Sequence, residues 1–131
     1  MEANELRIGN LLHFPFTGEN AEVLGINAHE YSEGIYNTIS YKKGINLYCE
    51  KIEVLKPITL TEEWLLKFGL EYLSPFGYKI KRGSFIKHDL ETNGYYFRWN
   101  GQTISLMYYV HELQNLYFAL TGEELTIKNQ E

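Results

Sequence analysis

The pair Asn100-Gly101 constrains the fold of this chain more than any other feature of its sequence, because aromatic and aliphatic runs flank it on both sides. A two-residue type I′ turn needs positive φ at both positions, and Asn-Gly adopts that conformation readily. Residues 95–99 and 102–107 are therefore predicted to form a β-hairpin. Side chains alternate along a strand, so the pattern predicts an apolar face and a polar face. The apolar face would hold Tyr95, Phe97, Trp99, Ile104 and Leu106, and the other Tyr96, Arg98, Thr103, Ser105 and Met107.

Two further segments carry helix signals. Thr61 is typical of an N-cap, Glu62 and Glu63 follow it in the first turn, and Gly69 suits a left-handed residue at the helix end. A second helix of about twelve residues is predicted from Val110, because apolar residues recur there at helical spacing until Gly122.

The fold class predicted from these signals is α+β. Residues 6–56 contain five short strand-like pieces, which indicate a small bent β-sheet or an SH3-like barrel. A helix, a four-stranded antiparallel meander over residues 76–108 and a final helix would follow. We expect residues 1–131 to form a single compact unit with a β-rich half (5–57) and a helix–four strands–helix half (58–128).

Composition and charge limit the cellular compartment and the classes of partner that we expect for this chain. Cys49 is its only cysteine, so no internal disulfide can form. No apolar run reaches the length of a membrane span and the first residues do not resemble a signal peptide, so we expect a cytoplasmic protein without a membrane partner. The net charge of −5 disfavours general affinity for polyanions, although residues 41–88 hold eight Lys and Arg82 against five Glu.

Motifs of known chemistry do not occur in the sequence. Phosphate-loop, dinucleotide-binding and nucleophile-elbow patterns are absent, as are paired cysteines. The histidines, at positions 13, 29, 88 and 111, show no metal-ligand spacing. The expectation is a protein that is not an enzyme, with no catalytic residue, cofactor or metal.

Residues 78–88 combine four fixed cations with aromatic residues and contain no acidic residue. Such a surface suits single-stranded nucleic acid, because cations contact phosphates and rings stack on bases. The residues for this function would be Lys79, Lys81, Arg82, Lys87 and Arg98. The competing interpretation is a solvated strand whose lysines guard a sheet edge.

Residues 57–70 (PITLTEEWLLKFGL) and 110–125 (VHELQNLYFALTGEEL), together with 5–10 (ELRIGN), resemble a group of short uncharacterised bacterial proteins. That group is typical of gut anaerobes and is often encoded in or near prophage-like elements. The resemblance implies a bacterial origin and a mobile-element context. It implies no activity, because the group has none assigned.

The function we expect first is that of a non-enzymatic accessory factor that binds another protein. Eleven Tyr exceed the needs of a small core, and Tyr is enriched in protein interfaces. The exposed contributors would be Tyr96, Met107, Tyr108 and Tyr109. Single-stranded nucleic acid is the alternative partner, and the sequence leaves the oligomeric state open.

Overall fold

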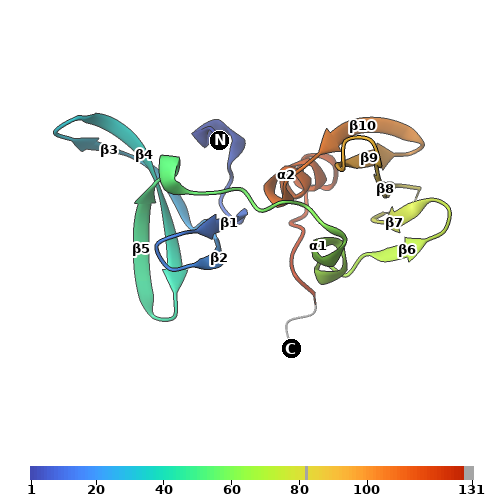
Figure 1. The fold of residues 1–131 in the computed structure, drawn as a ribbon, viewed down its shortest axis with the longest axis horizontal. Coiled ribbons are helices and arrows are strands. Elements are labelled where there is room, and N and C mark those ends of the chain that lie inside the picture. The colour runs from blue at the N-terminus through green and yellow to red at the C-terminus, as the bar shows by residue number, and fades with distance from the viewer. Residues whose placement is uncertain (82, 129–131) are drawn as a thin grey trace. The chain divides into compact units, whose positions relative to one another are not determined.

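The computed structural model describes residues 1–81 and 83–128, with the backbone alone for His29 and Tyr31. The described residues form a mixed α+β fold with ten strands in three antiparallel sheets and two α-helices (Figure 1), which confirms the predicted class. The chain divides into two compact units. The first contains residues 1–58 and 110–124, and the second contains residues 59–109 and 125–131.

Five strands and two 3-10 helices build most of the first unit. They are η1 (Ala3–Glu5), β1 (Leu11–Phe14), β2 (Glu19–Glu22), β3 (Gly25–Tyr31), β4 (Gly34–Lys43), β5 (Asn46–Lys51) and η2 (Ile52–Val54). The strands form a two-stranded sheet, β1-β2, and a three-stranded sheet, β3-β4-β5. No closed barrel is present in the described residues, so the predicted SH3-like barrel is not confirmed. The last of the five predicted strand-like pieces, residues 51–55, instead contains η2.

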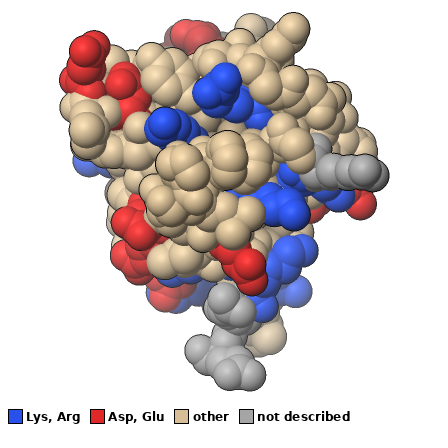
Figure 2. Space-filling model, turned by 90° about the vertical axis from the view of Figure 1, so that its right-hand side faces the viewer, with Lys and Arg blue, Asp and Glu red and all other residues tan. Residues whose placement is uncertain are grey.

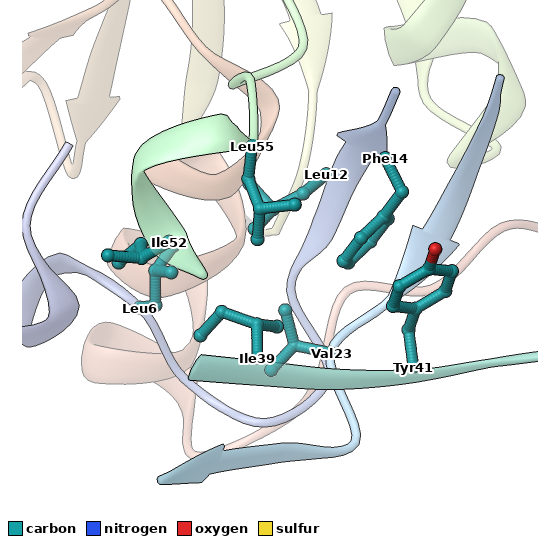
Figure 3. Packing of buried hydrophobic residues seen from close by; sticks show 8 residues of the cluster. All are labelled: Leu6, Leu12, Phe14, Val23, Ile39, Tyr41, Ile52 and Leu55. Atoms are coloured by element: carbon teal, nitrogen blue, oxygen red, sulfur yellow. The ribbon is translucent and has the colours of Figure 1, made fainter. Parts of the chain in front are cut away.

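The core of the first unit is a cluster of aliphatic and aromatic side chains between these elements (Figure 3). Phe14 on β1 stacks on Tyr41 on β4, with ring centroids 3.7 Å apart. Both rings are fully buried, and burial of aromatic area is a large contribution to stability. The other members shown in Figure 3 are Leu6, Leu12, Val23, Ile39, Ile52 and Leu55.

The long helix α2 (Val110–Thr121) belongs to the first unit, although the expected division placed it with the meander. Its predicted position is confirmed, and Gly122 ends it with a φ of +75°. Two polar side chains attach α2 to the first residue of β1 and to the residue before it. The Leu11 amide donates to Oε1 of Gln114 at 2.8 Å, and Nδ2 of Asn10 donates to Oδ1 of Asn115 at 2.7 Å.

The second unit contains a short helix and one antiparallel sheet. Helix α1 (Glu62–Lys67) precedes β6 (Glu71–Leu73), β7 (Gly77–Lys79), β8 (Phe85–His88), β9 (Tyr95–Trp99) and β10 (Gln102–Met107). The strand order is β10-β9-β8-β7-β6, a meander in which each strand pairs with its neighbours in sequence. The four strands expected within residues 76–108 are confirmed as β7 to β10, and β6 is an additional strand.

Helix α1 follows its sequence signals closely. The Trp64 amide donates to Oγ1 of Thr61 at 3.4 Å, as an N-cap requires. Gly69 has a φ of +82°, and the Leu70 amide donates to the Leu65 carbonyl at 3.1 Å, which closes the helix end. No helix among the described residues is long and apolar enough to span a membrane.

The hairpin between β9 and β10 is confirmed, but its register differs from the expectation. Asn100 and Gly101 both have positive φ, and Gln102 lies opposite Trp99. An irregularity between Thr103 and Ser105 then shifts the pairing, so that Met107 lies opposite Tyr95. The prediction that Leu106 shares the face of Tyr95 is therefore wrong, because a bulge exchanges the two faces of the strand beyond it.

Candidate functional site

One face of the five-stranded sheet brings together cationic and aromatic side chains from three strands. Lys79 on β7 lies opposite Phe85 on β8, and Phe85 lies opposite Arg98 on β9. Residues directly opposite each other in antiparallel strands share a face, so these three side chains form a row across the sheet. Lys87, two residues after Phe85, lies on the same face.

A groove of about 420 Å³ lies at the end of this row. Its walls come from three turns and two strands: Pro75, Phe76, Gly83, Phe85, Lys87, Arg98 and Gly101. Figure 2 looks onto the side of Figure 1 that carries β6–β10 and shows Lys and Arg atoms in several separate groups around uncharged surface. The groove thus combines two fixed positive charges with two aromatic rings.

The two phenylalanines of the groove form a stacked pair. The ring centroids of Phe76 and Phe85 are 5.3 Å apart, with an angle of 28° between the ring planes. Phe85 is half-buried in the sheet, whereas Phe76 lies in the β6–β7 turn and is 59% exposed. The outer ring is therefore supported from beneath and offers its surface to solvent.

The turn at Asn100-Gly101 positions Arg98 at the groove. Nη2 of Arg98 donates to the Gly101 carbonyl at 3.0 Å, which restrains the guanidinium beside the turn. The same turn is joined to the β7–β8 connection, because the Asn100 amide donates to Oγ of the buried Ser84 at 3.3 Å. The hairpin that dominates the sequence pattern therefore also supports the groove.

The structure brings only part of the predicted nucleic-acid set to this groove. Lys87 and Arg98 line it, and Lys79 is exposed in the same row of the sheet. Lys81 is half-buried and does not line the groove, and Arg82 lies outside the described residues. Phe76 was not among the residues predicted from the sequence, and its only signal was an aromatic residue in a Pro-Phe-Gly turn.

The predicted protein-interface set needs one correction. Tyr108 and Tyr109 are 41% and 37% exposed and Tyr96 is half-buried, but Met107 is only 1% exposed. The bulge between Thr103 and Ser105 turns Met107 into the core. The expectation that Met107 is exposed is therefore wrong.

A larger cavity of about 690 Å³ lies in the same unit. Tyr78, His88 and Tyr95 line it and alternate along their strands with the residues of the groove face. The remaining lining residues are Thr59, Leu60, Thr61, Glu62, Tyr72, Gly77, Lys87, Leu90 and Asn93. Nothing in the sequence pattern indicated this cavity, because its walls come from segments up to thirty-six residues apart.

Glu62 interacts with two tyrosines of the cavity. Its carboxylate interacts with the hydroxyl of Tyr78, and its backbone with the hydroxyl of Tyr95. Burial raises the pKa of both tyrosines, and in Tyr78 the Glu62 carboxylate adds to that effect. Both phenols therefore keep their protons at neutral pH.

The described residues do not form a metal-binding cluster. Within residues 1–81 and 83–128, no three or more His, Cys, Asp and Glu side chains gather in a metal-binding arrangement. His88 is engaged with Asn93, at 2.8 Å between Nε2 and Oδ1, and Cys49 is exposed on β5.

Comparison with known proteins identifies no relative. No family model matches the chain, and neither a curated protein nor a solved structure matches it.

Proposed function

We propose that the second unit binds single-stranded nucleic acid in the groove formed by Phe76, Phe85, Lys87 and Arg98. The observation that carries this proposal is the exposed, stacked Phe76 in the same groove as two fixed cations. Single strands expose their bases, which stack on aromatic rings, while Lys and Arg neutralise the adjacent phosphates. The bases of a duplex already stack on each other, so the groove should prefer single strands.

The distribution of charge supports binding at this place. Residues 72–88 contain four cationic side chains and no acidic residue, whereas the whole chain carries a net charge of −5. An acidic protein repels polyanions at long range. Binding should therefore depend on the few cations at the groove, and we expect modest affinity and no general attraction to polyanions.

The first experiment is fluorescence anisotropy with a labelled single-stranded oligonucleotide and with a duplex of the same sequence. We expect tighter binding of the single strand at low salt, and loss of most of that affinity in Lys87→Gln/Arg98→Gln. The control is Lys42→Gln/Lys56→Gln, which removes two exposed lysines from the first unit. Equal affinity in both double variants, or no binding by the wild type, would refute the proposal.

Stacking can be tested apart from charge. Phe76→Leu keeps an apolar side chain but removes the ring, so it should weaken single-strand binding about fivefold to a hundredfold, the range for one stacked base. Phe16→Leu is the matched control, because Phe16 is 75% exposed and belongs to the first unit. An unchanged affinity in Phe76→Leu would leave the groove without a stacking role.

A second candidate is the binding of another protein along the edge of the sheet. We infer a non-enzymatic, cytoplasmic accessory factor, and the resemblance implies the context of a bacterial mobile element. The observation that favours it is β10, an outermost strand with Ile104 44% exposed and Tyr108 exposed at its end. An outermost strand with apolar side chains can pair with a strand of a partner.

Affinity capture from a lysate of the source organism tests this second candidate. Ile104→Lys should abolish capture of a partner, because it places a charge on the edge. Ile45→Lys should not, since Ile45 is 96% exposed in the first unit. A strictly monomeric protein that captures nothing would remove this candidate.

A further inference from the structure

The cavity of about 690 Å³ in the second unit has the composition of a site for a positively charged ligand. Three tyrosines line it, together with the Glu62 carboxylate. The ring centroids of Tyr72 and Tyr78 are 5.2 Å apart and the ring planes meet at 67°, so these rings form two walls at a steep angle. Electron-rich ring faces attract ammonium groups, and tyrosine is among the best side chains for this contact.

The charge of Glu62 has no counter-ion within the described part of the chain. Glu63, the next residue, pairs with Lys67 at 3.5 Å, whereas no cationic side chain among the described residues forms an ion pair with Glu62. The Tyr78 hydroxyl interacts with this carboxylate but brings no positive charge. Such a negative group beside aromatic rings is suited to a cation.

We propose that this cavity binds a small organic cation, a protonated or quaternary amine on an apolar body, between the Glu62 carboxylate and the surrounding tyrosine rings. Its volume lies within the range of about 300–1,000 Å³ that is typical of small-molecule sites. Leu60 and Leu90 provide apolar contact for the body of the ligand. Tyr72 is 58% exposed, so the cavity is open to solvent on that side.

The amine site is distinct from the nucleic-acid groove, and Lys87 separates the two experimentally. Lys87 lines both the groove and the cavity, but its side chain lies on the groove face of the sheet, opposite to the face of Tyr78, His88 and Tyr95. Lys87→Gln should therefore weaken oligonucleotide binding and change amine binding little. This difference distinguishes two separate sites from a general loss of structure.

The experiment uses choline as the probe and follows the ring signals of Tyr78 and Tyr95 by NMR at constant ionic strength. The comparison ligand is dimethylbutanol, the neutral isostere in which carbon replaces the nitrogen. We expect choline to shift both rings and to bind at least about tenfold more tightly than dimethylbutanol.

Two neighbouring carboxylates give a matched pair of variants. Glu62→Gln keeps an acceptor for the Tyr78 hydroxyl but removes the charge, so choline binding should fall about tenfold. Glu63→Gln removes a charge from the same helical turn outside the cavity and should leave choline binding unchanged. No shift with choline, equal affinity for dimethylbutanol, or equal loss in the two variants would overturn the proposal.

Discussion

Asn115 shows how one side chain connects segments that are far apart in the sequence. It accepts hydrogen bonds from Nη1 of Arg7 at 3.0 Å and Nδ2 of Asn10 at 2.7 Å, and it donates to the Glu5 carbonyl at 2.7 Å. Asn10 is fully buried. Two of the segments that carry the resemblance, 5–10 and 110–125, thus contact each other through this residue.

Asn115→Ala should destabilise the protein. The substitution leaves Nδ2 of the buried Asn10 side chain without its acceptor, Oδ1 of Asn115. Such a loss costs about 1–3 kcal/mol. The measurement is the free energy of unfolding from urea titration. Asn46→Ala, an exposed position on β5, should change it by less than about 0.5 kcal/mol. Equal stability of Asn115→Ala and the wild type would contradict this role.

His111 makes the stability of the first unit depend on pH. It is 2% exposed, and burial lowers its pKa below 6.5 despite the opposing Glu112 and Glu5 carboxylates, while the N-terminal amine lowers it further. The unfolded chain therefore takes up the proton first as the pH falls. Stability contributed by neutral His111 is complete above pH 6.5 and decreases below it.

The test compares the free energy of unfolding above and below pH 6.5 in the wild type and in His111→Gln. The wild type should lose stability on acidification over this interval, and the variant should lose less, because Gln does not titrate. If both proteins show the same pH dependence, another group is responsible.

At the scale of elements, the features that were predicted correctly from the sequence are those that local signals determine. The Asn100-Gly101 turn, the Thr61 cap and the stop at Gly122 each depend on the conformation of a few neighbouring residues. The bulge between Thr103 and Ser105 and the strand β6 depend on pairing with other strands. Such pairing is not encoded in a local pattern, and it decided that Met107 is buried.

The candidate site was predictable only in part for the same reason. The charges of Lys87 and Arg98 were visible in the sequence, but their proximity to Phe76 depends on the register of three strands. The interactions of Glu62 with Tyr78 and Tyr95 bring α1 together with strands that follow it later in the chain. No spacing rule predicts such a contact.

Gly77 provides a test of the sheet that carries both the groove and the cavity. Its φ is +114°, and a Cβ there would lie 2.4 Å from the Ile86 carbonyl oxygen on the adjacent strand. Gly77→Ala should therefore destabilise the second unit by more than about 2 kcal/mol. Gly101→Ala should cost only about 1–2 kcal/mol, because its φ is also positive but no atom lies within 4 Å of the Cβ position. Urea unfolding of both variants measures the difference, and equal losses would contradict the steric explanation.

At the scale of the whole molecule, the two units differ in the roles that we propose for them. The first unit joins two separate stretches of the sequence, because α2 contacts the start of β1. The second unit contains both proposed binding sites, on opposite faces of one meander. In the function that we propose, the acidic total charge confines nucleic-acid binding to the few cations of the groove.

The central claim is that the cations of the groove bind the phosphates of a single strand. The salt dependence of oligonucleotide binding tests this claim most directly. Each phosphate neutralised on a single strand contributes about −0.7 to the slope of log K against log salt concentration. If Lys87 and Arg98 both contact phosphates, Lys87→Gln/Arg98→Gln should have a slope smaller in magnitude by about 1.4, while Lys42→Gln/Lys56→Gln keeps the wild-type slope. A wild-type slope near zero, or the same slope in all three proteins, would contradict the proposed role of the groove.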